Sequence, residues 1–183
     1  FLDASCLMYD FDGKFCDYVD YNRARRGGVR HSGDIIDTEK QEGKHTIDIK
    51  MSRLPPHVKH LFFVISTWQG PKLREVRQPF IRLCDPDSLD MEELCRYTQQ
   101  HDAAALADAT SAVMCHLHRR SAAENHWQAT AVGRTGKGCA GHYAPIKKMC
   151  AEVLGVEPLD SQKAPRDSDN SWGDEYDSDN SWN

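Results

Sequence analysis

The sequence of 183 residues lacks any long apolar run, and its cysteines show no paired spacing. A bilayer-crossing helix needs roughly 18–20 consecutive apolar residues, so no membrane span is expected. The seven cysteines are odd in number, and no CxxC pair occurs among them. We therefore expect reduced, partly buried thiols in a cytoplasmic protein rather than a disulfide framework.

The body of the chain also lacks an excess of either charge. Residues 160–183 hold seven acidic side chains and two basic ones, a net charge of −5, and the whole chain is also at −5. Residues 1–159 are therefore neutral, which argues against nucleic acid or an acidic membrane as a partner.

Catalytic and nucleotide-binding motifs are missing as well. No Ser/His/Asp or Cys/His set has supporting context, and Cys115 and His116 are neighbours in a predicted strand, where they point to opposite faces. The glycine-rich stretch 133–141 fails the phosphate-loop spacing, because Gly138 follows Lys137 where a hydroxyl is required. We expect a flexible connector there, and no enzymatic activity.

What the sequence does contain is a mainly β pattern. Asp12-Gly13 suits a turn between two β-favouring runs, 46–51 alternates in polarity, and 60–66 is a continuous apolar run typical of a strand covered on both faces. Residues 78–85 and 125–133 also look like strands, whereas 102–119 combines helical propensity with a strand-like second half. About seven short strands and one helix, at 142–155, predict a β-sandwich with one C-terminal helix.

The last residues form a separate segment. DSDNSW occurs at 167–172 and again at 177–182. Such acidic, Ser/Asn-rich composition cannot bury enough apolar surface to fold. We therefore divide the chain into a folded domain, 1–157, and a disordered acidic tail, 158–183, whose tryptophans could anchor a protein partner. The tail does not fit an EF-hand, because Trp172 replaces the glycine that the loop needs.

Two charged stretches remain as candidate sites. Residues 31–45, HSGDIIDTEKQEGKH, offer Asp34, Asp37, Glu39 and Glu42 for a Ca²⁺ ion, which takes six to eight oxygen ligands, with Asp3 as a distant ligand. The alternative is an acidic, solvent-facing loop. Residues 22–31, NRARRGGVRH, hold four arginines that could bind an anion, and the alternative is a solvated hairpin loop.

The order of several motifs resembles the TerD family of tellurium-resistance and stress proteins, in a divergent form of eukaryotic type. The resemblance covers about residues 2–155 and rests on LDASCLMYDFDGK, VRHSGD, LPPHVKHLFFVIS, FIRLCD and HWQATAVG. It implies a β-sandwich with calcium-binding acidic loops and no demonstrated enzymatic activity. Because family domains carry strands ahead of the LDAS segment, we also expect this chain to be a fragment.

Departures from the family pattern weaken the implied calcium site. Ile35 replaces the family's asparagine, and the later acids are replaced by Gln41, Gly43, Lys44 and His45. Fewer carboxylates lower calcium affinity, and Lys44 adds a positive charge. The remaining metal ligands are Asp3, Asp34, Asp37 and Glu39. The prediction is a calcium-binding stress-response module with a weakened site, or else a metal-free scaffold that binds partners through the arginine loop or the acidic tail.

Overall fold

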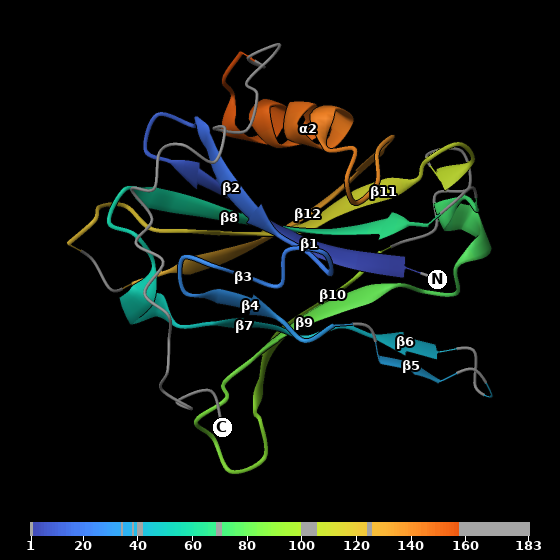
Figure 1. Ribbon diagram of the computed structural model, residues 1–183, viewed down its shortest axis with the longest axis horizontal. Helices are drawn as coiled ribbons and strands as arrows, with labels where there is room; N and C mark the ends of the chain where they lie inside the picture. The colour runs from blue at the N-terminus through green and yellow to red at the C-terminus, as the bar shows by residue number, and fades with distance from the viewer. Residues whose placement is uncertain are drawn as a thin grey trace.

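A five-stranded antiparallel sheet forms the centre of the domain. The computed structural model describes residues 2–33, 35–37, 39, 42–68, 71–99, 106–123 and 126–157 (Figure 1). The strands lie in the order β12, β11, β8, β1, β2, with bounds Gln128–Gly136, Ser111–His118, Val58–Thr67, Leu2–Asp10 and Phe15–Val19. The apolar run that was predicted to be covered on both faces is β8, at the middle of this sheet, so that prediction is confirmed.

The predicted hairpin at Asp12-Gly13 joins β1 to β2. The Asp10 carboxylate accepts hydrogen bonds from the backbone N–H groups of Asp12 and Lys14, and Gly13 has φ +74°. An L-residue adopts such a positive φ only with strain, which explains the glycine.

One face of the sheet packs against the helix α2, Ala144–Leu154 (Figure 1). The helix ends at Gly155 in the left-handed conformation, as its sequence predicts. The core between helix and sheet contains Leu7, Tyr9, Phe15, Phe62, Val64, Val113, Ala140, Tyr143, Ile146, Met149 and Cys150.

Smaller sheets cover the opposite face of the central sheet (Figure 1). They are the sheet β3-β4-β7 (Arg25–Arg26, Val29–His31 and Ile47–Ile49) and the pair β9-β10 (Phe80–Cys84 and Glu93–Thr98). A further pair, β5-β6 (Ile35–Asp37 and Glu42–Lys44), extends away from the layers at the lower right of Figure 1. Short 3₁₀ turns are η1, Met51–Arg53, and η2, Leu73–Glu75. The alternation of β1 sends Leu7 toward α2 and sends Cys6 and Met8 into the second core, between the layers. The predicted mainly β architecture with one C-terminal helix is confirmed.

Several local predictions need correction. The described residues hold twelve strands rather than about seven, and β10 was not predicted. Met51, expected on the apolar face of a strand, begins η1 and is exposed. The stretch 102–119, which combined helical and strand signals, is a strand from Ser111 to His118. Residues 100–105 lie outside the described residues.

The expected flexible connector is also partly wrong, because β12 continues to Gly136. Its glycines are needed for close contact. A Cβ on Gly133 would lie 2.1 Å from Tyr97 Oη, and a Cβ on Gly136 would lie 2.6 Å from Met149 Sδ. The close approach of Tyr97 and Met149 therefore requires glycine at these two positions, and no local sequence pattern indicates this requirement.

No helix among the described residues is long and apolar enough to cross a membrane. All seven cysteines are free thiols, as expected. The predicted tail, 158–183, lies outside the described residues.

Candidate metal centre

Asp3 is the buried carboxylate of the predicted site. It lies near the start of β1 opposite Ser66 of β8, with 6% of its surface exposed and its Oδ2 atom shielded from solvent. The neighbouring strand β2 pairs with β1 only as far as Cys6. Asp3 therefore lies in the part of β1 beyond the end of β2.

Two histidines mark the ends of the acidic stretch. His31 ends β4, His45 follows β6, and their ring centroids lie 5.5 Å apart. His45 Nε2 is 2.5 Å from the carbonyl oxygen of Leu2. A carbonyl only accepts, so Nε2 is the protonated nitrogen of His45. Gly33 N–H donates to His31 Nδ1 at 3.0 Å, which places the proton of neutral His31 on Nε2. His31 and His45 together form the base of the acidic stretch, and the His45–Leu2 hydrogen bond attaches this base to β1 next to Asp3.

The other predicted ligands are only partly described. Asp37 ends β5, and its Oδ1 accepts the backbone N–H of exposed Glu39 at 3.1 Å. Asp34 lies outside the described residues, as do the side chain of Glu42 and most of the connection between β5 and β6. Lys44 on β6 pairs with Ile35 on β5, and its side chain is exposed.

These placements do not by themselves assemble a metal site. Within the described part of the chain, no three His, Cys, Asp or Glu side chains are arranged to hold one ion. The structure brings the base of the acidic stretch to the strand of Asp3, and it joins Asp37 to Glu39. The donors are carboxylate oxygens, the ligand type that Ca²⁺ prefers.

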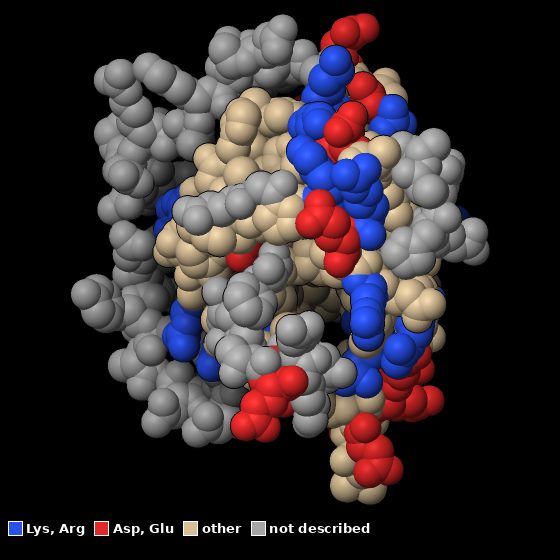
Figure 2. All heavy atoms as spheres, turned by 90° about the vertical axis from the view of Figure 1, so that its right-hand side faces the viewer, with Lys and Arg blue, Asp and Glu red and all other residues tan. Residues whose placement is uncertain are grey.

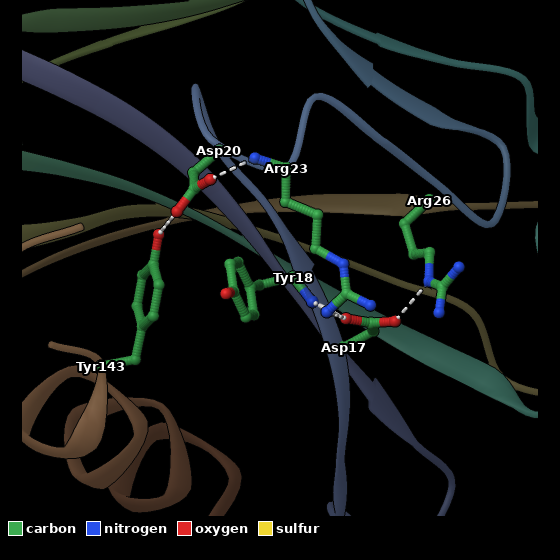
Figure 3. A network of polar contacts seen from close by, with 6 residues as sticks. All are labelled: Asp17, Tyr18, Asp20, Arg23, Arg26 and Tyr143. Atoms are coloured by element: carbon green, nitrogen blue, oxygen red, sulfur yellow. Dashed lines mark hydrogen bonds and ion pairs between the residues drawn. The ribbon is translucent and has the colours of Figure 1, made fainter. Parts of the chain in front are cut away.

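The second charged stretch is a tight hairpin with an internal acidic partner (Figure 3). Arg25–Arg26 pair with Val29–Arg30 around Gly27-Gly28. Buried Asp17 accepts Arg23 Nη1 at 2.8 Å and Arg26 Nε at 2.9 Å. Two of the four arginines are therefore engaged in ion pairs within the molecule, which favours the structural alternative to an anion site for them.

A buried polar chain that sequence reasoning missed links β1, β2 and the helix. Tyr143 donates from its hydroxyl to Asp20 Oδ2 at 2.7 Å (Figure 3). Ser5 Oγ lies 2.8 Å from the same hydroxyl. Burial, and then hydrogen bonding to Asp20, raises the pKa of Tyr143. Tyr143 is more than a hundred positions from both Ser5 and Asp20 in the sequence. The only local signal was Asp20 itself, a typical turn residue, which accepts the backbone N–H groups of Asn22 and Arg23 after β2.

A further unpredicted cluster consists of three histidines on the helix-facing side of the sheet. His116 and His118 lie on β11, and His60 lies opposite His118 on β8. Burial lowers the pKa of His60 to about 4 and that of His116 to about 3, with the neighbouring charges adding to the effect. The sequence signal was HLH in an alternating strand, which places both rings on one face.

Charge on the surface is mixed rather than segregated. On the face at the right of Figure 1, basic and acidic side chains lie interspersed (Figure 2). This agrees with the neutral net charge of residues 1–159 and gives that face no broad basic field.

Fold and site together define the class: a helix-covered antiparallel β-sandwich with an acidic stretch attached beside a buried carboxylate. The TerD domain model matches residues 1–146, and the chain belongs to this family. It is 30% identical over 139 residues to tellurium resistance protein TerZ of Serratia marcescens, covering 75% of this chain and 67% of that protein. It is 27% identical to stress response protein SCP2 of Bacillus subtilis, covering 72% and 66%.

The fold likeness extends to solved structures. A homologue of telluride resistance protein TerD from Streptomyces coelicolor superposes with a TM-score of 0.61 at 14% identity, over 81% of this chain and 85% of that one. At this identity the likeness supports the fold alone.

Proposed function

We propose that this domain is a non-enzymatic, cytoplasmic binding module of the stress-response or tellurium-resistance type. Support comes from its membership of the TerD family and from the names of its relatives, a tellurium resistance protein and a stress response protein. The chain spans about two thirds of the length of these two relatives, so their whole activity is not carried over.

We further propose weak calcium binding through Asp3, Asp34, Asp37 and Glu39. The single observation that supports it is the buried Asp3 carboxylate beside the attached base of the acidic stretch. Carboxylate oxygens are the ligands that Ca²⁺ prefers. Exposed Lys44 on β6 opposes a bound cation, so we expect affinity below that of sites with a full set of carboxylates.

Isothermal titration with CaCl₂, paired with thermal unfolding, tests the calcium proposal. A ligand that binds only the native state raises the melting temperature. We expect heat and stabilisation at millimolar Ca²⁺, both lost in Asp3→Asn. Asp12→Asn, which removes an exposed acid from the β1–β2 turn, is the matched control and should behave as wild type. No heat and no stabilisation at millimolar Ca²⁺ would refute calcium binding.

The second candidate is a metal-free scaffold that holds protein partners. Lys44 in the acidic stretch favours it. The pairing of Arg23 and Arg26 with Asp17 argues against these two arginines as the contact surface. The tail is then the main contact, and a double Trp172→Ala/Trp182→Ala variant of the full chain should lose partner capture while keeping its unfolding midpoint. Undiminished capture would rule the tail out.

A further inference from the structure

The β9–β10 hairpin displays apolar side chains that the domain core does not use. Four of the eight exposed large apolar side chains of the described residues lie on this hairpin: Phe80 at 51%, Leu89 at 104%, Met91 at 53% and Leu94 at 58% of full exposure. Leu89 is completely surrounded by solvent. Large apolar side chains that gather on one surface commonly mark an interaction site.

Acidic side chains alternate with the apolar ones along the tip of the hairpin. Asp85, Asp87, Asp90 and Glu92 lie in the connection between the strands, and none has an ion pair among the described residues. Figure 1 shows the hairpin projecting from the body, and acidic and uncharged side chains make up the lowest tip in Figure 2. The tip therefore combines apolar anchors with an unneutralised negative rim.

Hydrogen bonds within the connection stabilise the turn at the tip. Asp85 N–H donates to the carbonyl of Glu92 at 2.9 Å, and Ser88 Oγ donates to the carbonyl of Asp85 at 2.9 Å. Met91 has φ +49°, uncommon for a residue with a side chain, and its N–H donates to the carbonyl of Ser88. The loop thus adopts a strained turn that directs Leu89 and Met91 outward.

The base of the hairpin is anchored to the body. Ile81, Leu83 and Tyr97 pack against the cores on the inner side. On the outer side Arg96 binds Glu93 through two hydrogen bonds of 2.9 and 2.7 Å and covers the ring of Phe80 at 4.5 Å. A surface fixed before binding loses less entropy when a partner docks.

We propose that this hairpin tip is a docking surface for a basic amphipathic segment of a partner protein. Leu89, Met91 and Leu94 are the apolar anchors, and the four acids form the rim. Complementary charge speeds encounter and selects the partner, while buried apolar anchors supply most of the affinity. The negative rim repels nucleic acid and anionic lipid, and it also repels the same tip of a second copy.

A model peptide pair tests the proposal with the full-length chain in EDTA, so that calcium has no influence. One helical peptide carries leucines on one face and lysines on the other, and its partner replaces each lysine by glutamate. Titrations followed by fluorescence anisotropy should show binding of the lysine peptide and none of the glutamate peptide. We expect L89S/M91S/L94S to weaken binding at least tenfold, and D85N/D87N/D90N/E92Q to weaken it and flatten its salt dependence.

Two control variants separate this surface from others. F11S/M51S removes exposed apolar side chains elsewhere, and D174N/E175Q/D177N/D179N neutralises tail acids. Both should bind the lysine peptide as wild type. Equal binding by the wild type and the L89S/M91S/L94S variant would overturn the proposal, as would loss of binding on tail neutralisation alone. A hairpin-dependent dimer in light scattering would also overturn it, because the occupant would then be a second copy.

Discussion

His60 Nδ1 and His116 Nε2 lie 2.9 Å apart across β8 and β11, within hydrogen-bonding distance on the helix-facing side of the sheet. The His116 ring also stacks on Phe62 at 4.3 Å. One nitrogen donates and the other accepts only while at least one ring is neutral, so the contact depends on the protonation state.

The first prediction is a loss of stability in mild acid. The pKa values of His60 and His116 are lowered to about 4 and about 3, below the usual value of about 6.5 in an unfolded chain. Between the folded-state and unfolded-state pKa values, the unfolded chain binds more protons than the folded one. The contribution of these two histidines to the free energy of unfolding is therefore fully present above pH 6.5 and decreases as the pH drops. Urea midpoints at pH 7.5, 6 and 5 should decline, and H60Q/H116Q should decline less. Equal declines would show that other groups are responsible.

The second prediction concerns the hydroxyl of Tyr143. Tyr143→Phe leaves the Asp20 carboxylate without its donor from the helix side, and a buried group that loses a partner costs about 1–3 kcal/mol. Tyr18→Phe removes the same atom from a partly buried ring of the same core and should change the unfolding free energy by less than about 0.5 kcal/mol. The comparison uses urea unfolding at pH 7.5. Similar values for the two variants would contradict a special role for the Tyr143–Asp20 contact.

The third prediction separates steric from conformational cost at glycine. Gly133 and Gly141 both have positive φ, +67° and +81°, so alanine is strained at either position. Only at Gly133 would the new Cβ meet a neighbour, Tyr97 Oη, whereas a Cβ on Gly141 would have nothing within 4 Å. Gly141→Ala should cost about 1 kcal/mol and Gly133→Ala about 1–3 kcal/mol more. Adding Tyr97→Phe to Gly133→Ala should recover part of the difference.

The fourth prediction concerns the buried guanidinium of Arg119. Its nitrogens donate to the carbonyls of Val58, Pro55 and Pro56 at 2.8–3.0 Å. The two prolines precede β8, and Arg119 supplies side-chain donors to the carbonyls of this turn and of the first β8 residue; the Pro55 carbonyl also accepts the N–H of Val58. Arg119→Lys keeps the charge but not the planar set of donors, so we expect a loss of about 2–4 kcal/mol in urea unfolding. A loss below about 0.5 kcal/mol would show that solvent replaces these bonds.

The candidate site was predictable only in part. The motif and the acidic residues pointed to Asp3 and the 31–45 stretch, and the structure attaches that stretch to β1 through His45 and Leu2. The pairing of Asp17 with Arg23 and Arg26 could not be predicted, because each arginine had several acids within reach along the chain. The tight contacts of β12 could not be predicted either, since they depend on Tyr97 and Met149 from other elements.

The sequence by itself determined the local elements. Each local signal acts over a few residues: alternation, apolar runs, the Asp12-Gly13 turn and the Gly155 cap. The elements β1, β2, β8 and α2 could therefore be recognised without knowing which other elements pack against them. The tertiary structure alone decided which side chains meet. His60 and His116 are 56 positions apart, and Ser5 and Tyr143 are 138 apart. Their contacts exist because strand order and layer packing bring distant segments together, and alternation within one strand specifies a face but not the neighbour on it.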